Sequence, residues 1–456
     1  MLKKQKSRSK TRHTASTNRR IFSGMAVVAV MTLVVKLMAA AKELVIADYF
    51  GTGDMVDAFL FAYLLPAFAI NVLSGSFSAA MMPTYIRTRE NQGIQAANKL
   101  FSSLMLVGVL FLLVAAGILA VFAPTILSIL GSGFNEQTML LTQTLFYWLL
   151  PVLVFTGIGQ LFATIINARE RFATVALAPA LTPICMVIAL ITLTDEWGIF
   201  ALAEGAVLGA ALELLVLIIA AVRKNIPVLP RWHGMTEELR TVIGQYTPMI
   251  AGAFLMSGTG LVDQSMAAML EPGSVATLNY ANKVVAMILS IGSMALGTAV
   301  LPHFSRLVGH KDWVGLRHTF RTYAWLIVFI SVPATVLLFL FSQPIIQLLF
   351  ERGAFTSADT RLVSQVQAYY LLQLPFYMLG ILGVRLISAM TKNDILMKIA
   401  AVSLIINIAG NYLFMQHFGV AGIALSTAMV YFISTIMILI FLNKSIVASA
   451  ALVSKT

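Results

Sequence analysis

Charge is what this sequence has least of. Only 11% of its 456 residues are Asp, Glu, Lys or Arg, whereas roughly a quarter of a soluble domain is charged. Hydrophobic residues make up 59%, and the mean hydropathy is +0.88. The apolar runs are long enough to cross a hydrocarbon core, which takes about 20 residues per helix. The composition predicts an all-α integral membrane protein that crosses the bilayer many times.

Cysteine is almost absent. Cys185 is the single cysteine of the sequence, and it lies in an apolar run. One thiol excludes a disulfide within the chain and any cysteine-based metal site. The first apolar stretch runs into charged residues rather than into a small-residue cleavage site, which argues against a cleavable signal peptide.

The apolar runs predict twelve transmembrane helices joined by short connections. We place these spans at 23–46, 57–83, 100–123, 140–166, 173–194, 198–222, 242–268, 274–301, 321–342, 363–390, 395–415 and 419–443. No connection is long enough to fold as a separate domain. Enzymes such as glycan polymerases or ligases need a sizeable outer loop with catalytic groups. The longest outer loop, 343–362, offers Glu351, Arg352 and Asp359 but no histidine, so we expect a transporter, not an enzyme.

The loop charges predict the orientation of the chain. Residues 1–20 hold eight Lys/Arg and no acid. The six connections that lie on the opposite side from the N-terminus hold two cations, Arg352 and Arg361, against eight Asp/Glu. Because Lys and Arg accumulate on the cytoplasmic side, both termini are expected in the cytoplasm. The same logic interprets the basic tail as a topology signal, and we expect no nucleic-acid partner.

Two halves of the sequence resemble each other. The stretch "GDMVDAF…MMPTYIR" (53–87) parallels "GSVATLNYANK…VLPHFSR" (273–306). Two loops rich in glycine and phenylalanine, within 126–151 and 345–375, match as well. Six spans repeated in the same orientation are typical of many transporters. The predicted organisation is a basic tail (1–22), an N-lobe (23–222), a cytoplasmic linker (223–241), a C-lobe (242–443) and a cytoplasmic tail (444–456).

Nine charges remain inside or at the ends of the spans. They are the cations Lys36, Lys42, Lys283 and Arg385, and the anions Glu43, Asp57, Glu204, Glu213 and Asp263. A charge at membrane depth costs about 2.5–3.5 kcal/mol on insertion scales, so it normally faces protein or a water-filled cavity. Lys36, Lys283 and Arg385 predict a shared cationic cavity for an anionic amphiphile that carries a phosphate or pyrophosphate.

Roles that involve no substrate stay open for Lys42, Glu43, Glu213 and Asp57. Lys42 and Glu43 could reach the outer interface, and Glu213 could pair with a neighbouring helix. Asp57 lies at the start of the second span, where a carboxylate suits a helix N-terminus.

Three stretches resemble the MviN/MurJ family of lipid II flippases, within the multidrug/oligosaccharidyl-lipid/polysaccharide exporter superfamily. They are "GTGDMVDAFLFAYLLPAF", "GSVATLNYANKV" and "LLFERGAFTSADT", and the resemblance covers residues 20–440. It implies a V-shaped pair of six-helix lobes that alternate between inward-open and outward-open states. It also implies an undecaprenyl-pyrophosphate-linked saccharide as cargo, either lipid II or an exopolysaccharide or oligosaccharide repeat unit.

The resemblance assigns roles to particular residues. It implies headgroup contacts at Lys36, Lys42, Lys283 and Arg385, with Glu43, Asp57 and Asn282 as supporting or gating residues. Family members typically carry arginine where this chain has Lys36 and Lys42, and an Arg-Arg pair where it has Ile70 and Asn71. They also commonly carry two further C-terminal spans. Because lysine does not replace arginine at a bidentate diphosphate site, these departures favour a prenyl-linked glycan other than lipid II.

A second set of residues resembles a sodium site described for some family members. Asn407 and Asn411 share a helix face because they are four residues apart, and Thr427 and Asp263 lie on other spans. Oxygen ligands of this kind suit a hard cation, although interhelical hydrogen bonding explains them too. We expect no cofactor and no metal beyond such a sodium ion. Sodium, a proton or the membrane potential is the expected source of coupling.

Three other functions compete with a flippase. A drug or metabolite exporter of the same superfamily should line its cavity with acids and aromatics, and a glycan-modifying enzyme lacks its loop here. A non-transporting scaffold of a glycan-synthesis complex should tolerate loss of its membrane charges. The expected protein is a monomer in the bacterial cytoplasmic membrane, with glycan-synthesis proteins as candidate partners.

Overall fold

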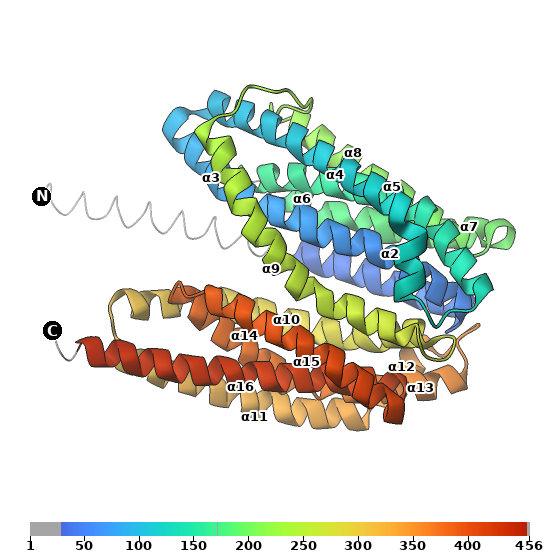
Figure 1. Cartoon of the computed structure of the whole chain (residues 1–456). Helices are drawn as coiled ribbons and strands as arrows, with labels where there is room; N and C mark the ends of the chain where they lie inside the picture. The colour runs from blue at the N-terminus through green and yellow to red at the C-terminus, as the bar shows by residue number, and fades with distance from the viewer. Residues whose placement is uncertain (1–28, 171, 454–456) are drawn as a thin grey trace, which may run out of the picture. The chain divides into compact units, whose positions relative to one another are not determined.

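The chain forms a bundle of helices in a computed structural model that describes residues 29–170 and 172–453. The expected basic tail 1–22 lies outside this range. Within it the structure contains no β-strand (Figure 1). The first described helix covers 29–50, and the elements before the connection at 223–236 are α2 (Asp54–Ala69), η1 (Ile70–Gly75), α3 (Ser76–Gln92), α4 (Ile94–Leu130), α5 (Glu136–Ala168), α6 (Phe172–Leu177), η2 (Ala178–Ala180), α7 (Leu181–Trp197) and α8 (Phe200–Val222).

The second half of the chain repeats this all-helical plan. Its helices are α9 (Glu237–Ala267), α10 (Ser274–Gly309), α11 (Trp313–Leu340), α12 (Ser342–Phe350), α13 (Ser357–Leu371), α14 (Leu374–Ala389), α15 (Asp394–Phe418) and α16 (Val420–Val453). α16 therefore extends to Val453, ten residues beyond the expected end of the last span at 443.

Ten helical segments of the described chain are long and apolar enough to cross a membrane. They correspond to ten of the twelve expected spans. The first expected span begins before residue 29, and the seventh corresponds to α9, a helix of 31 residues that is not among the ten segments. Many side chains on these helices are apolar and exposed, such as Val121, Met256 and Phe329 at 73%, 75% and 78%. Such surfaces suit contact with lipid, so the chain is a multi-pass membrane protein.

Equivalent helix hairpins in the two halves turn on equivalent glycines. α7 ends at Gly198 with φ 53° and ψ −131°, and α15 ends at Gly419 with φ 55° and ψ −136°. A positive φ of this kind favours glycine because it has no Cβ. Gly419 is followed at once by α16, and Gly198 is separated from α8 by Ile199 alone. The matching corners support the internal repeat that the sequence predicts.

Close approach of backbones holds each hairpin together. A Cβ on Gly205 of α8 would lie 2.6 Å from the Cα of Met186 on α7, and one on Gly422 of α16 would lie 2.3 Å from the carbonyl oxygen of Phe414 on α15. Small residues at such contacts allow van der Waals packing, which drives helix association in lipid. α15 and α16 run side by side along their length (Figure 1).

Packing divides the chain into two compact units that differ from the expected lobes. Among the described residues, one unit contains those up to 42, 69–120 and 148–249, and the other contains 43–68, 121–147 and those from 250 onward. The chain passes between them five times. Four of these crossings lie within four residues of a helix proline, at Pro66, Pro124, Pro151 and Pro248. The lobe boundaries drawn from the repeat stay a prediction.

Each unit has its own core. In the first, buried side chains of α3, α4, α5 and α8 pack together, among them Phe77, Phe101 and Phe162. In the second, α10, α13, α14 and α16 pack against one another, with α11 on α13 and α14 and with α15 on α16. These helices carry most of the residues expected to bind the cargo or an ion.

Candidate substrate and ion sites

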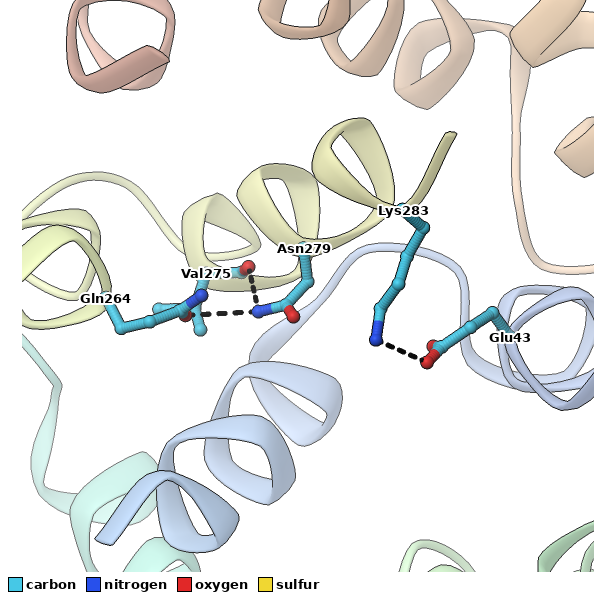
Figure 2. A network of polar contacts seen from close by, with 5 residues as sticks. All are labelled: Glu43, Gln264, Val275, Asn279 and Lys283. Carbon is cyan, nitrogen blue, oxygen red and sulfur yellow. Dashed lines mark hydrogen bonds and ion pairs between the residues drawn. The ribbon is translucent and has the colours of Figure 1, made fainter. Parts of the chain in front are cut away.

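Lys283 forms an ion pair with one of the expected supporting carboxylates. It lies on α10, and its Nζ is 2.8 Å from Oε1 of Glu43, on the helix that covers 29–50. Figure 2 shows the two side chains pointing toward each other, with Asn279 one turn earlier on α10. The Glu43 side chain is 6% exposed, whereas that of Lys283 is 44% exposed. One partner of the pair is therefore accessible from outside the protein.

Asn279 stands on the same face of α10 as Lys283, four residues away. Its Nδ2 donates to Oε1 of Gln264 at 3.1 Å and to the carbonyl oxygen of Val275 at 3.2 Å (Figure 2). Asn282, the neighbour of Lys283 that was expected to support it, is exposed. Near Lys283, α10 thus carries one cation in an ion pair and the amide side chains of Asn279 and Asn282.

Arg385 lies on α14 and is only partly buried as a whole residue. Its Nε is a buried donor with no hydrogen-bond partner among the described residues. A buried guanidinium N–H without an acceptor destabilises the protein, because this charged donor loses its hydrogen bonds to water and gains none in return. An anionic group that reached this position would satisfy this donor, and the headgroup contact expected at Arg385 stays a prediction.

Lys36 and Lys42 are half-buried in the helix over 29–50 and belong to the first compact unit. Lys283, Arg385 and Glu43 belong to the second. The structure thus brings together one of the four expected cations, Lys283, with the carboxylate of Glu43. The gathering of all four cations around one headgroup stays a prediction.

The positions where family members carry an Arg-Arg pair lie in a π-helix. Ile70 and Asn71 begin η1, which continues the helix of α2 and leads into α3. Ile70 is buried and Asn71 is exposed. Short π-helical segments occur frequently at functional sites. This chain therefore has a π-helix at these two positions, but it lacks the two arginine side chains.

Asp57 caps a helix other than its own. Its Oδ2 accepts a hydrogen bond from the backbone N–H of Gly273 at 2.7 Å, and its Oδ1 accepts one from Ala276 at 2.7 Å. The side chain was expected to stabilise the start of its own span, and it does lie in the first turn of α2. However, its carboxylate serves the N-terminus of α10, where unpaired N–H groups and the helix dipole favour a negative charge. Asp57 is 1% exposed.

Further contacts join the same chain segment to the second half. The hydroxyl of Tyr280 on α10 donates to the carbonyl oxygen of Gly51 at 3.3 Å. The N–H of Ala354 donates to the carbonyl oxygen of Asp48 at 2.7 Å. The hydroxyl of Thr52 also donates to Asp359. We name the contacts of residues 48–57 with α10 and with residues 351–359 the 48–57 seam.

Sequence reasoning missed Tyr280 and the loop at 351–359 as partners of this seam. One local signal was available, because Thr356 and Asp359 form a capping box at the start of α13, which the T-x-x-D spacing predicts. Another was Gly273 itself, because glycine is accepted at helix N-caps, and the structure places it directly before α10 with a φ of 86°. Neither signal indicates which distant segment will dock there.

The four residues proposed as a cation site come together around Asp263 of α9. Its Oδ1 accepts hydrogen bonds from Nδ2 of Asn407 at 2.9 Å and from Nδ2 of Asn411 at 2.7 Å, both on α15. Its Oδ2 accepts one from Oγ1 of Thr427 on α16 at 3.3 Å. Asp263, Asn407 and Asn411 are 9%, 1% and 0% exposed. We name this group the Asp263 cluster.

Two acceptors of the Asp263 cluster lack donors. The Oδ1 atoms of Asn407 and Asn411 are buried and have no hydrogen-bond partner among the described residues. Their Nδ2 atoms face the Asp263 carboxylate. If each amide turned over, the two oxygens would join the carboxylate and the Thr427 hydroxyl around one ligand. Oxygen donors are what a hard cation prefers. The residues present therefore fit a sodium ion, and within the described part of the chain no group of three or more His, Cys, Asp or Glu residues could hold another metal.

Comparison with known proteins identifies the family. The profile described as "Lipid II flippase MurJ" matches residues 46–456. The chain belongs to the MurJ family. The "Probable lipid II flippase MurJ" of Synechocystis is 26% identical over 438 residues, covering 92% of this chain and 80% of that protein. The "Lipid II flippase MurJ" of Burkholderia cenocepacia is 25% identical over 449 residues, covering 93% and 84%.

Solved structures agree on the fold. A lipid II flippase MurJ in an inward closed conformation has a TM-score of 0.80 at 22% identity and covers 93% of this chain and 90% of that one. An inward-facing multidrug resistance MATE family transporter of the MOP superfamily has a TM-score of 0.78 at 13% identity, with coverage of 93% and 99%. At these identities the likeness shows the fold alone. MurJ proteins are transporters, so this chain is a multi-pass transporter of the bacterial inner membrane with a lipid-linked substrate.

Proposed function

We propose that this MurJ-family protein is an alternating-access flippase that moves an undecaprenyl-pyrophosphate-linked saccharide from the inner to the outer leaflet. Lipid II is the cargo that the names of the relatives favour. The lysines that replace arginines favour a different prenyl-linked glycan, whereas the names of the relatives support lipid II. The family match over residues 46–456 is the observation that carries this proposal.

The ion pair of Lys283 and Glu43 gives the proposal a physical mechanism. A pyrophosphate and the Glu43 carboxylate compete for the same ammonium group, and the exposed side of Lys283 can receive the phosphate. A ligand shifts a conformational equilibrium only if it binds the two states with different affinity. Exchange of Glu43 for the headgroup on Lys283 supplies such a difference, because it releases the helix over 29–50 from α10.

Headgroup binding then extends to the other cations. In the proposed site Lys36, Lys42 and Arg385 contribute further positive charge, and the unpartnered Nε of Arg385 is ready to donate to an anion. Asp57 and the rest of the 48–57 seam form the outer gate, which must open before cargo leaves. Opening that gate removes two short hydrogen bonds from the N-terminus of α10.

Complementation of a strain depleted of its lipid II flippase tests the cargo. We expect the wild-type gene to restore growth, and Lys283→Ala to fail while it inserts in normal amounts. Lys398→Ala is the matched control, because Lys398 is an exposed lysine on α15 outside the proposed site. Growth with Lys283→Ala equal to wild type would contradict the role of Lys283. Failure of the wild-type gene, with export of another prenyl-linked glycan intact, would contradict lipid II as cargo.

The Asp263 cluster favours sodium as the coupling ion. We infer that Na⁺ binds between α9, α15 and α16, held by Asp263, Asn407, Asn411 and Thr427. The two buried amide oxygens without donors support this assignment. Sodium should raise the unfolding temperature of the purified protein, and potassium at equal ionic strength should not. An equal response to the two ions would leave the proton or the membrane potential as the source of coupling.

The remaining assignments concern topology and assembly. Loop charges support a cytoplasmic location for both termini, and accessibility of Cys residues introduced into the connections would test it. We propose that the protein acts as a monomer, with glycan-synthesis proteins as candidate partners. Light scattering of the purified protein measures the first assignment, and co-purification from the native membrane measures the second.

A further inference from the structure

The connection between α8 and α9 is pinned to α4 by two consecutive serines. The hydroxyl of Ser102 donates to the carbonyl oxygen of Leu229 at 3.0 Å and accepts from the N–H of Arg231 at 2.9 Å. The hydroxyl of Ser103 likewise accepts from the N–H of His233 at 3.0 Å. Both serines are buried. The linker therefore has a defined course over the end of α4, although it contains no helix of its own.

A cavity of about 340 Å³ lies where the linker meets α4. This volume falls at the lower end of the range of small-molecule pockets, about 300–1,000 Å³. The lining consists of Asn98, Lys99, Ser102, Pro227, Val228, Leu229, Arg231 and His233. It thus contains two permanent cations and a histidine, and no carboxylate. Its charge fits an anion.

A third cation, Arg169, contacts the lining residue Asn98. The Oδ1 of Asn98 accepts from Nη2 of Arg169 at 2.5 Å, and Nη1 of Arg169 donates to the carbonyl oxygen of Lys224 at 2.6 Å. The Nε of Arg169 donates to the hydroxyl of Tyr85 at 3.0 Å. In these contacts Arg169 donates to neutral acceptors alone. Its positive charge is therefore not cancelled by them, and it adds to the positive potential near Asn98.

The same linker presents apolar side chains to its surroundings. Leu229, Trp232 and Met235 are 62%, 50% and 56% exposed, and they alternate with Arg231 and His233. Exposed apolar residues interleaved with cations at the end of a membrane-spanning segment are typical of an interfacial segment, in which Trp lies at the level of the headgroups. Ile226 instead belongs to the core of the first unit, and Val228 is partly buried, packing against that core while it also lines the cavity.

We propose that this cavity binds the phosphate headgroup of an anionic phospholipid. Lys99 and Arg231 contact the phosphate, Pro227, Val228 and Leu229 pack against the glycerol and the start of the acyl chains, and Trp232 lies in the surrounding interface. Apolar walls beside the cations favour a lipid over a free phosphate, which has nothing to bury there. The site lies outside the proposed cargo site and does not depend on which glycan is carried.

Thermal unfolding of the full-length protein in detergent tests the site. Phosphatidylglycerol is titrated against phosphatidylcholine of the same acyl chains, with inorganic phosphate and glycerophosphoglycerol as soluble anions. We expect phosphatidylglycerol alone to raise the unfolding temperature of the wild-type protein. Lys99→Gln and Arg231→Gln should each weaken that response about tenfold in lipid concentration, and the double variant should abolish it.

Arg240→Gln is the matched control, because Arg240 is an exposed cation near the start of α9 that does not line the cavity. It should respond like the wild type. If the double variant does not fold, the two single variants decide the question. An equal response to phosphatidylcholine, an equal response to phosphate, or an undiminished response of both single variants would each overturn the proposal. The second outcome would identify a soluble-anion site, and the first would leave the linker as a surface for a protein partner.

Discussion

Two buried carboxylates in the same compact unit, Asp57 and Asp263, are held in opposite ways. Asp57 accepts only backbone N–H groups in its short contacts with α10, and these groups belong to a helix end that needs a negative charge. Asp263 accepts from side chains, two of which present amide oxygens that have no donor. The first arrangement is complete in itself, whereas the second is complete only with a further positive charge.

The difference indicates different functions. A carboxylate that caps a distant helix joins two chain segments, so it controls whether the 48–57 seam is closed. A carboxylate among unsatisfied oxygens is suited to exchange its ligand, because an added cation replaces weak donors with stronger attraction. Four substitutions separate these roles, and they are ordered from the largest expected effect to the smallest.

Asp57→Ala should have the largest effect on stability. It leaves the N–H groups of Gly273 and Ala276 buried without an acceptor, and each orphaned group costs about 1–3 kcal/mol. We expect a loss of about 2–6 kcal/mol in the free energy of unfolding, measured in detergent. Asp54→Ala, in the same turn of α2, is the control and should lose far less. Equal losses would show that Asp57 does not hold the seam.

Asp263→Asn should remove the response to sodium while the fold persists. Asparagine has nearly the same shape, but it lacks the charge that holds a cation among neutral oxygens. At a sodium concentration of about 100 times the dissociation constant, the wild type should gain about 2.7 kcal/mol that this variant does not gain. Isothermal calorimetry and thermal unfolding measure the difference. Asp394→Asn, at the start of α15, should keep the full response, and a sodium response in Asp263→Asn would refute the site.

Glu43→Gln tests a carboxylate of intermediate character, because its partner Lys283 is partly exposed. An ion pair of this kind contributes little to stability, about 1 kcal/mol or less. The expected effect is therefore on transport, since a headgroup no longer competes with a carboxylate for Lys283. We expect tighter headgroup binding and slower turnover in a flippase assay with reconstituted protein. Unchanged binding, alongside an unchanged Glu136→Gln control, would rule out competition at Lys283.

Thr427→Val should have the smallest effect. It removes one hydrogen bond to Asp263, of a kind typically worth about 0.6 kcal/mol within membranes. The sodium affinity should fall by a few fold, as measured by the shift of unfolding temperature with sodium concentration. Thr144→Val is matched, because the Thr144 hydroxyl bonds only to its own helix at Leu140. If the two variants bind sodium equally well, the Thr427 hydroxyl is not a ligand.

The sequence predicted features that depend on the chain within one helix. Hydropathy located the spans, and the spacing of Asn407 and Asn411 placed them on one helix face. Both predictions depend on periodicity and local conformation. The family resemblance added Asp263 and Thr427 to the set, and the structure places all four side chains in contact.

Partners on distant helices could not be predicted in the same way. Nothing in the pattern around Asp57 indicates that it reaches Gly273, 216 residues away. The rotation of one helix against another decides this, and it depends on many small packing contacts. For the same reason sequence reasoning assigned Glu43 a supporting or gating role without naming its partner, and only the coordinates pair it with Lys283.

The prolines near the unit crossings affect the exchange of backbone amides with solvent. A proline donates no helical hydrogen bond, and its ring pushes away the carbonyl of the preceding turn. The helices therefore each lack a backbone hydrogen bond near the place where the chain passes from one unit to the other, at Pro66, Pro124, Pro151 and Pro248. In a hydrogen–deuterium exchange experiment, these four turns should take up deuterium earlier than the turns on either side of them.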